Sequence, residues 1–146
     1  MTSQKEDLAR EAMLMTRLNQ YPHQHLLPLL AIEYDASSRV SMVVPIAKFG
    51  SMLDLVDHLD FDGLSISLGD IGLTLYQIST ALLHLDSIEI CHGDVTARNV
   101  LVFKYEPGRP EKMVVKLGDY GEANRGRESP SCIVQLACEL QELVPR

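Results

Sequence analysis

The strongest restriction on the fold comes from residues 68–121, where a long helical pattern leads into a polar loop and then into a hairpin pattern. Residues 68–85 place apolar side chains at alternating spacings of three and four, which predicts an amphipathic helix. Residues 100–103 and 113–117 are short apolar runs separated by the turn-forming segment 105–110, which predicts a β-hairpin. The polar residues on both sides of this hairpin are therefore expected to meet at one end of it.

Three of these polar residues have side chains that suit magnesium. Asp94 and Asn99 precede the hairpin, and Asp119 follows it. Carboxylate and amide oxygens, together with substrate phosphates, are the ligands that Mg²⁺ prefers. Such residues are also common turn formers, so each one alone is a weak signal. Their occurrence together, after a long amphipathic helix, predicts a site at which the three side chains converge.

Helical patterns also occupy both ends of the chain. Residues 5–18 carry an apolar stripe that includes Glu11. A carboxylate on such a stripe is costly to bury unless a cation meets it or it reaches water at the rim. Ser129-Pro130 is typical of a helix start, and apolar residues recur on one face after it as far as Val144.

Between these ends the sequence predicts strands, a connector and one short helix. Residues 25–32 and 40–44 predict two strands, and residues 45–50, with a proline and a glycine, predict an extended connector. A capping-box pattern at Ser51 and Asp54 predicts the start of the short helix. The order of these elements is that of an α+β fold.

Composition excludes several classes of function. The 146 residues are 46% hydrophobic and 23% charged, which is typical of a globular chain and not of a disordered one. A formal net charge of −7 without a basic cluster argues against nucleic acid as a partner. No apolar run approaches the roughly 20 residues of a membrane span, and the first residues lack the apolar core of a signal peptide. The odd count of three cysteines suits a reducing compartment, so a cytoplasmic location is expected.

The polar segments and their surroundings resemble a protein kinase domain of the tyrosine-kinase-like type. Residues 92–99 (HGDVTARN) resemble the catalytic loop H-R-D-L-A-A-R-N, and residues 119–121 (DYG) resemble the D-F-G motif. Residues 8–15 resemble helix C with its ion-pairing glutamate, and residues 42–54 resemble strand 5, the hinge and the start of helix D. The resemblance covers residues 8–122 and implies a protein-kinase-like fold that is truncated: part of the N-lobe from helix C, the hinge and the first part of the mostly helical C-lobe.

The resemblance implies a role for each matching residue. Asp94 would accept the proton of the substrate hydroxyl, and Arg98 would help to position the substrate and this base. Asn99 and Asp119 would hold Mg²⁺ on the phosphates of ATP, and Glu11 would pair with the lysine of strand 3. The adenine site would be formed by the gatekeeper Val44, backbone groups of Pro45 and Ala47, and Leu101 as its floor. Four further residues would stack as a hydrophobic spine: Met15, Leu29, His92 and Tyr120.

Several features depart from the family pattern. Neither a glycine-rich loop nor a strand 3 lysine precedes the helix C pattern. Gly93 occupies the position of the arginine that usually reads a phosphorylated activation loop. After Gly121 there is no A-P-E motif and no tyrosine, and residues 122–146 do not resemble the family. We therefore expect the isolated chain to be inactive.

These features predict a division of the chain into two parts. Residues 1–122 are expected to be a partial protein kinase domain, with an N-lobe remnant at 1–44, a hinge at 45–50 and the start of the C-lobe at 51–122. Residues 123–146 are expected to be a divergent tail that forms an amphipathic helix.

The predicted function is transfer of the γ-phosphate of ATP to a protein hydroxyl, with tyrosine as the expected acceptor. Gly93 leaves a second possibility open, because an H-G-D…N…D pattern also marks small-molecule phosphotransferases of the aminoglycoside- and choline-kinase-like type; residues 96–99 (TARN) in place of H-P-x-N argue against it. A third possibility is a non-catalytic pseudokinase or a regulatory binding fragment, supported by the missing lysine. A structural metal site at His23 and His25 is not expected, since no third ligand is in view.

Overall fold

The computed structural model describes residues 4–126 and 129–144; the remaining positions of the expected N-lobe remnant and tail lie outside the described residues. It is a mixed α+β fold, as predicted. Its elements in chain order are α1 (Gln4–Leu18), β1 (Ala31–Tyr34), β2 (Val40–Val43), α2 (Met52–Phe61), α3 (Leu68–Ser87), β3 (Ile90–Cys91), β4 (Val100–Lys104), the 3-10 turn η1 (Pro110–Lys112), β5 (Val114–Leu117), β6 (Asn124–Arg125) and α4 (Ser131–Glu142).

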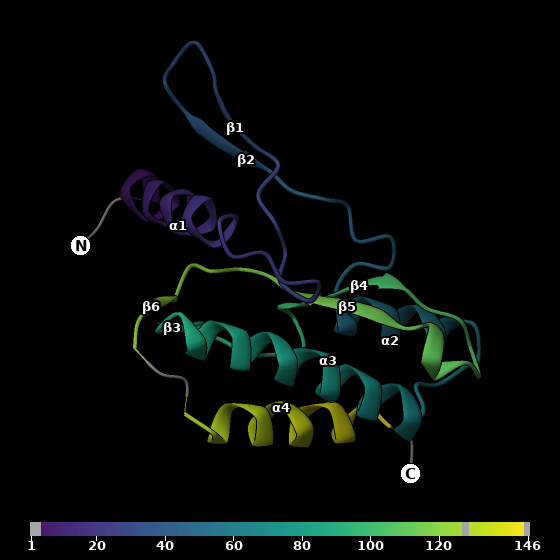
Figure 1. Cartoon of the computed structure of the whole chain (residues 1–146). Helices are drawn as coiled ribbons and strands as arrows, with labels where there is room; N and C mark the ends of the chain where they lie inside the picture. Colours follow the sequence, from purple (N-terminus) through teal and green to yellow (C-terminus); the bar gives the residue numbers. More distant parts are fainter. Residues whose placement is uncertain (1–3, 127–128, 145–146) are drawn as a thin grey trace.

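The elements divide into a small part that contains α1 and a larger, mostly helical part. Within the described residues, the strands form three two-stranded antiparallel sheets: β1–β2, β3–β6 and β4–β5. Figure 1 shows α1 and the β1–β2 hairpin at one end of the molecule, with α2, α3, α4 and the β4–β5 hairpin at the other. Helix α3 packs against β5 on one side and against α4 on the other (Figure 1).

The predicted helices at 5–18 and 68–85 are confirmed as α1 and α3, and the predicted last helix as α4. Each buries the expected stripe. In α1 the buried residues include Met15 and Leu18, and in α3 they include Ile78 and Leu85. In the described part of the chain, no helix is long and apolar enough to cross a bilayer.

The strand predicted at 25–32 is wrong in its position. Strand pairing with β2 is confined to Ala31–Tyr34, with one more bond from the Leu30 amide to the Val43 carbonyl, and residues 25–27 are bound elsewhere. The Leu27 amide donates to the Leu117 carbonyl at 2.9 Å, and the Leu117 amide donates to the His25 carbonyl at 2.9 Å. Pro28 has no N–H to continue a ladder, so the apolar run divides at this residue. Its first part thereby ties the end of α1 to β5 of the larger part.

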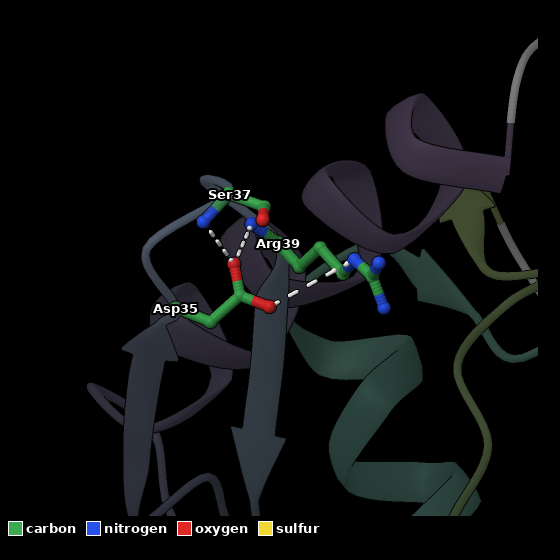
Figure 2. Close-up of polar contacts among 3 residues, drawn as sticks. All are labelled: Asp35, Ser37 and Arg39. Atoms are coloured by element: carbon green, nitrogen blue, oxygen red, sulfur yellow. Dashed lines mark hydrogen bonds and ion pairs between the residues drawn. The ribbon is translucent and has the colours of Figure 1, made fainter.

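The polar turn of the β1–β2 hairpin is held by one carboxylate. Asp35 Oδ1 accepts hydrogen bonds from the amides of Ser37 and Arg39, both at 2.8 Å, and Asp35 Oδ2 lies 3.8 Å from the Arg39 guanidinium (Figure 2). A side-chain oxygen that accepts from its own backbone two residues on is the usual mechanism of an Asx turn. The predicted polar turn is thus confirmed, and its chemistry is local.

Two helices of the larger part begin with capping boxes. At α2, Asp54 N donates to Ser51 Oγ and Ser51 N donates to Asp54 Oδ2, as predicted. Ser67 and Asp70 repeat the arrangement at α3, where it was not predicted. Gly50 precedes the first box with a φ of +71°, and a Cβ there would lie 2.5 Å from Asp54 Oδ2. Only glycine therefore fits where the connector turns into α2.

The hydrophobic core lies where α3 meets the β4–β5 hairpin and α4. The buried side chains with the least exposure include Ile78 of α3, Val115 of β5, and Leu136 and Leu140 of α4, all at 0%. The two-residue strands β3 and β6 pair Ile90 with Arg125 next to this core, and they were not predicted. Helix α4 is thus part of the same core as the polar loop and its hairpin.

Candidate active site

The polar loop 92–99 is fixed at its start by a buried histidine. The His92 side chain is 0% exposed. Its Nδ1 accepts a hydrogen bond from the Asp94 amide at 3.1 Å, and its Nε2 lies 2.7 Å from the Gly118 carbonyl oxygen. An atom that accepts from an amide carries no proton, so Nε2 holds the ring proton and donates it. His92 therefore connects the start of the loop to the segment that follows β5.

Asp94 and Asn99 are brought into direct contact. The Asn99 side-chain amide nitrogen donates to the Asp94 carbonyl and to Asp94 Oδ2, both at 2.8 Å. Because both N–H bonds of that nitrogen are used, Asn99 Oδ1 remains as the atom that can accept or ligate. The Asn99 carbonyl accepts from the Gly118 amide at 2.9 Å. Asn99 thus sits between the carboxylate of Asp94 and the backbone that leads to Asp119.

Asp119 is exposed and adopts an unusual backbone conformation. Its φ is +56°, a region that residues with a side chain seldom occupy. Its Oδ1 accepts from the Gly121 amide at 3.2 Å. Strained backbone of this kind persists only where surrounding structure holds it, and it concentrates at functional sites. Asp119 follows directly after Gly118, the residue to which both His92 and Asn99 are bonded.

Glu11 and its neighbour on α1 bind the backbone of the Asp119-Tyr120-Gly121 segment. Glu11 Oε1 accepts from the Tyr120 amide at 3.1 Å, and the Arg10 guanidinium donates to the Gly121 carbonyl at 2.7 Å. Burial raises the pKa of Glu11, the charge of Asp119 raises it further, and the bond from the Tyr120 amide opposes both. Among the described residues no cation pairs with Glu11.

Tyr120 fills the centre of this region. Its side chain is 1% exposed, and its ring meets the His92 ring edge to face at 5.5 Å between centroids. The hydroxyl lies 3.2 Å from the Leu27 carbonyl and 3.1 Å from the Leu117 carbonyl, so its single proton is shared between them. Burial raises the pKa of Tyr120, which stays neutral. The other two residues of the expected spine, Met15 and Leu29, are also buried.

The backbone explains the glycine in the loop. Gly93 has a φ of +84°, and a Cβ at this position would lie 2.6 Å from the Glu122 carbonyl oxygen. An arginine here would meet both the conformational cost of positive φ and this contact. The departure from the H-R-D pattern therefore has a cause in the backbone of this chain.

The connector places backbone groups beside the β4–β5 hairpin. The Phe49 amide donates to the Val102 carbonyl at 3.1 Å, the Val102 amide donates to the Gly50 carbonyl at 2.8 Å, and Ser51 forms a bridge with Leu101. Within the described residues, the Pro45 carbonyl and the Ala47 amide make no hydrogen bond.

The expected adenine-site residues sit along this connector and hairpin. The half-buried side chain of Leu101 lies next to Gly118. The side chain of Val44 is partly buried and packs against the core. Three of these residues follow the end of β2 and the fourth lies in β4: Val44, Pro45, Ala47 and Leu101.

Arg98 is exposed, and in the described part of the chain its side chain makes no hydrogen bond or ion pair. Of the predicted site residues, Asp94 and Asn99 are therefore in direct contact, and Asp119 is joined to them through the backbone of Gly118. Arg98 has no fixed partner among the described residues.

The oxygen donors suit a hard cation. Asn99 Oδ1 and the exposed carboxylate of Asp119 are the kinds of ligand that Mg²⁺ takes from a protein when phosphates and waters supply the rest. Among the described residues, no group of three or more His, Cys, Asp or Glu side chains could enclose a metal. His23 and His25, rings 5.7 Å apart, gain His84 as a neighbour and still form no such group.

Glu139, like Arg10, is a residue of this region that was not predicted from the sequence. Glu139 of α4 is half-buried, and its Oε1 accepts from the Ala97 amide at 3.2 Å. It lies three residues after Leu136 and directly before Leu140, so it borders the apolar stripe of its helix. An acidic residue at that position was a signal of the same kind as Glu11.

Comparisons with known proteins agree on the family to which these features point. The model of a family described as protein tyrosine and serine/threonine kinase matches residues 1–139. A tyrosine-protein kinase, SRK3 of Spongilla lacustris, is 30% identical over 122 residues, which are 84% of this chain and 33% of the relative. A serine/threonine-protein kinase, DCLK1 of Rattus norvegicus, is 26% identical over 119 residues, 82% of this chain and 25% of the relative.

One solved structure supports the fold. The crystal structure of the Rad53 kinase domain and SCD2 superposes with a TM-score of 0.65 at 23% identity, covering 84% of this chain and 41% of that one. The chain spans a third or less of the length of the two curated relatives.

Proposed function

This chain belongs to the family of protein tyrosine and serine/threonine kinases, and on that premise we propose that its polar loop forms the phosphoryl-transfer end of a kinase active site. The observation that carries the proposal is the contact between Asp94 and Asn99, joined through Gly118 to Asp119. The proposed reaction is transfer of the γ-phosphate of ATP to a protein hydroxyl.

Each residue of the loop has a task in this proposal. Asp94 accepts the proton of the attacking hydroxyl, and the Asn99 amide holds its carboxylate in one orientation by a 2.8 Å hydrogen bond. Asn99 Oδ1 and Asp119 hold Mg²⁺, which when bound with ATP neutralises charge on the phosphate oxygens. Arg98, exposed beside the base, is free to contact the protein substrate.

The connector is the proposed adenine site. The Pro45 carbonyl and the Ala47 amide are the backbone acceptor and donor that adenine would use, since neither is bonded within the described residues. Val44 and Leu101 would cover and support the ring with apolar surface. Glu11 is proposed to pair with the lysine of kinase strand 3 in a protein that contains that strand. In the structure described here, its carboxylate accepts a hydrogen bond from the Tyr120 amide.

Tyrosine is the proposed acceptor, on the ground of the Ala97-Arg98-Asn99 ending of the loop. The relatives include a tyrosine kinase and a serine/threonine kinase, so the choice of tyrosine as acceptor rests on the loop sequence and not on the relatives. A cytoplasmic location is proposed with it, because an odd count of three cysteines without a C-x-x-C pair suits a reducing compartment.

The test measures ATP binding and phosphate transfer separately. We expect the 146-residue chain to bind ATP more tightly with Mg²⁺ than with EDTA, and we expect Asp119→Asn to remove that difference. Asp57→Asn, which changes an exposed carboxylate of α2, is the matched control. Equal ATP affinity with Mg²⁺ and with EDTA in the wild-type chain would contradict the metal site.

Transfer is assayed on a tyrosine peptide, a serine peptide and small alcohols. We expect no transfer by this chain alone, because no lysine meets Glu11 among the described residues. We expect a full-length protein that contains it to prefer the tyrosine peptide and to lose activity with Asp94→Asn. Preference for small alcohols would instead support the aminoglycoside- and choline-kinase-like alternative, and full-length protein without any transfer would support the pseudokinase.

A further inference from the structure

We propose that Glu139 is a positioning residue that holds the loop 92–99 in the geometry used by Asp94 and Asn99. This inference deepens the proposed function and rests on it for the meaning of the loop. It assigns a role to α4, which lies in the segment 123–146 that was predicted to be a divergent tail.

The first step concerns the bond itself. The Ala97 residue is 0% exposed, so its amide cannot be solvated by bulk water. Glu139 Oε1 accepts from this amide at 3.2 Å. A buried N–H without a partner is costly, and a bond to a carboxylate is stronger than one to a neutral acceptor. Ala97 therefore gains its hydrogen bond from another element and not from its own loop.

The second step connects that bond to the polar side chains. The backbone amide of Asn99 donates to the Thr96 carbonyl at 3.0 Å, which closes a tight turn with Ala97 and Arg98 at its centre. Asn99 is the last residue of this turn, and its side chain donates a hydrogen bond to the Asp94 carboxylate. Holding the Ala97 amide therefore fixes the turn that aims Asn99.

The third step concerns the support behind Glu139. Leu136 and Leu140 are both 0% exposed, and α4 packs along α3 (Figure 1). Glu139 lies between these two anchors along the helix, so its position is fixed by the packing of α4. A carboxylate delivered from a rigid helix to a loop constrains the loop more than one delivered from another loop.

The test separates the hydrogen bond from charge and from packing. Glu139→Met removes the acceptor and keeps a long side chain with good helix propensity. Glu139→Gln removes the charge and keeps a carbonyl oxygen at the same position. Glu142→Met, at an exposed glutamate of the same helix, is the matched control. All three are made in the 146-residue chain.

The first measurement is amide hydrogen exchange by NMR. We expect the Ala97 amide to exchange about tenfold faster or more in Glu139→Met, the size of losing one charge-assisted bond. We expect Glu139→Gln to stay within about threefold of wild type, and Glu142→Met to leave Ala97 unchanged. An unchanged Ala97 amide in Glu139→Met, or an equal rise in Glu142→Met, would overturn the proposal.

The second measurement is one that a purely structural role of α4 would not change. We expect Glu139→Met to reduce the gain in ATP affinity that Mg²⁺ provides by about threefold or more, while affinity in EDTA stays constant. We expect Glu139→Gln to restore most of that gain. A loss of affinity in EDTA as large as that with Mg²⁺ would show general unfolding and overturn the positioning role.

The two proposals fail in different ways. If wild-type chain gains no affinity from Mg²⁺, the proposed function fails, while Ala97 exchange still tests the contact from α4. If Mg²⁺ strengthens ATP binding and Glu139→Met changes neither measurement, the function stands and the role of Glu139 is wrong.

Discussion

At the scale of single residues, the site is held mainly by bonds to backbone. His92, Glu11 and Glu139 each direct a side chain to an amide or carbonyl of a neighbouring segment. Backbone partners do not depend on the identity of the residue that carries them. The geometry of the loop therefore depends less on the side chains of the residues that are bonded than on the backbone path between them.

Gly93 provides the first prediction. Gly93→Ala should lower the free energy of unfolding by about 1–3 kcal/mol, because the new Cβ meets the Glu122 carbonyl and the residue keeps a positive φ. Gly72→Ala is the control, since Gly72 lies within α3 with open space around it, and it should stabilise the chain by about 0.5–1 kcal/mol. Urea unfolding of both variants measures the difference. Equal effects of the two substitutions would contradict the conformation described for Gly93.

Tyr120 provides the second prediction, because it stands where the family motif has phenylalanine. Tyr120→Phe restores D-F-G and should cost about 1–2 kcal/mol of unfolding free energy, since it leaves the Leu27 carbonyl without its hydroxyl partner. Tyr76→Phe, at a tyrosine that is 67% exposed, should change stability little. Thermal unfolding followed by circular dichroism measures both, and a Tyr120→Phe variant as stable as wild type would contradict the bond.

At the scale of elements, the helices of the larger part depend on local caps as well as on packing. The two capping boxes satisfy amide groups that the first turn of each helix leaves unpaired. Helix α2, with 10 residues, is marginal alone in water, so its cap adds to the stability that core packing supplies.

The cap of α2 provides the third prediction. Ser51→Ala removes the oxygen that accepts from the Asp54 amide and should cost about 1 kcal/mol. Ser65→Ala, at an exposed serine of the loop before α3, is the control and should cost nothing measurable. Urea unfolding compares them, and a cost shared by both variants would mean that the cap contributes nothing.

The sequence predicted elements well where a period was long and poorly where a partner decided the structure. Helices α1 and α3 follow from their spacing, and Asp94, Asn99 and Asp119 follow from the loop and hairpin pattern. The segment 25–32 could not be placed, because a short apolar run does not say which of two strands it will bond. Strands β3 and β6 are two residues each, too short to carry any period.

The contacts within the site were less predictable than its residues. Glu11 was expected either to meet a cation or to reach water at the rim, and the bond that it accepts from the Tyr120 amide was not predicted. Nearly every residue has a backbone amide, so the sequence does not indicate which one will bind a given carboxylate. The same reason hid the bond from Glu139 to Ala97, although its acidic character on an apolar stripe was visible.

At the scale of the whole molecule, the smaller part is attached to the larger through the connection between α1 and β1. His84 Nε2 of α3 donates to the Tyr21 carbonyl at 2.7 Å, and the His84 ring lies 5.1 Å from that of His23. Burial lowers the pKa of His23, and the nearby His84, His25 and Lys116 lower it further. His23 is therefore neutral in the folded chain at neutral pH.

This arrangement provides the fourth prediction. A histidine with a lowered pKa binds fewer protons when folded than when unfolded, so stability falls as pH drops below about 6.5, the ordinary value for His23. His23→Asn keeps an acceptor for the His25 amide and should lose less stability between pH 7.5 and 5.5 than wild type does. His58→Asn, at an exposed histidine of α2, is the control.

Urea unfolding at the two pH values checks this prediction. His58→Asn should lose at least as much stability as the wild-type chain, because it lacks an imidazole that can pair with Asp62 once protonated, and His23→Asn should lose less. An identical pH dependence in all three would mean that burial of His23 does not affect folding.

The β1–β2 hairpin projects from the molecule with no third strand beside it among the described residues (Figure 1). A two-stranded ribbon is barely stable alone in water and this one is supported by its contact with α1, so it should melt in sub-global openings while α3 and α4 stay intact. The connector 45–50 begins where β2 ends and would slacken with it, whereas the loop 92–99 is held by buried groups. On warming, the two ends of the site should thus come apart in sequence, the connector first.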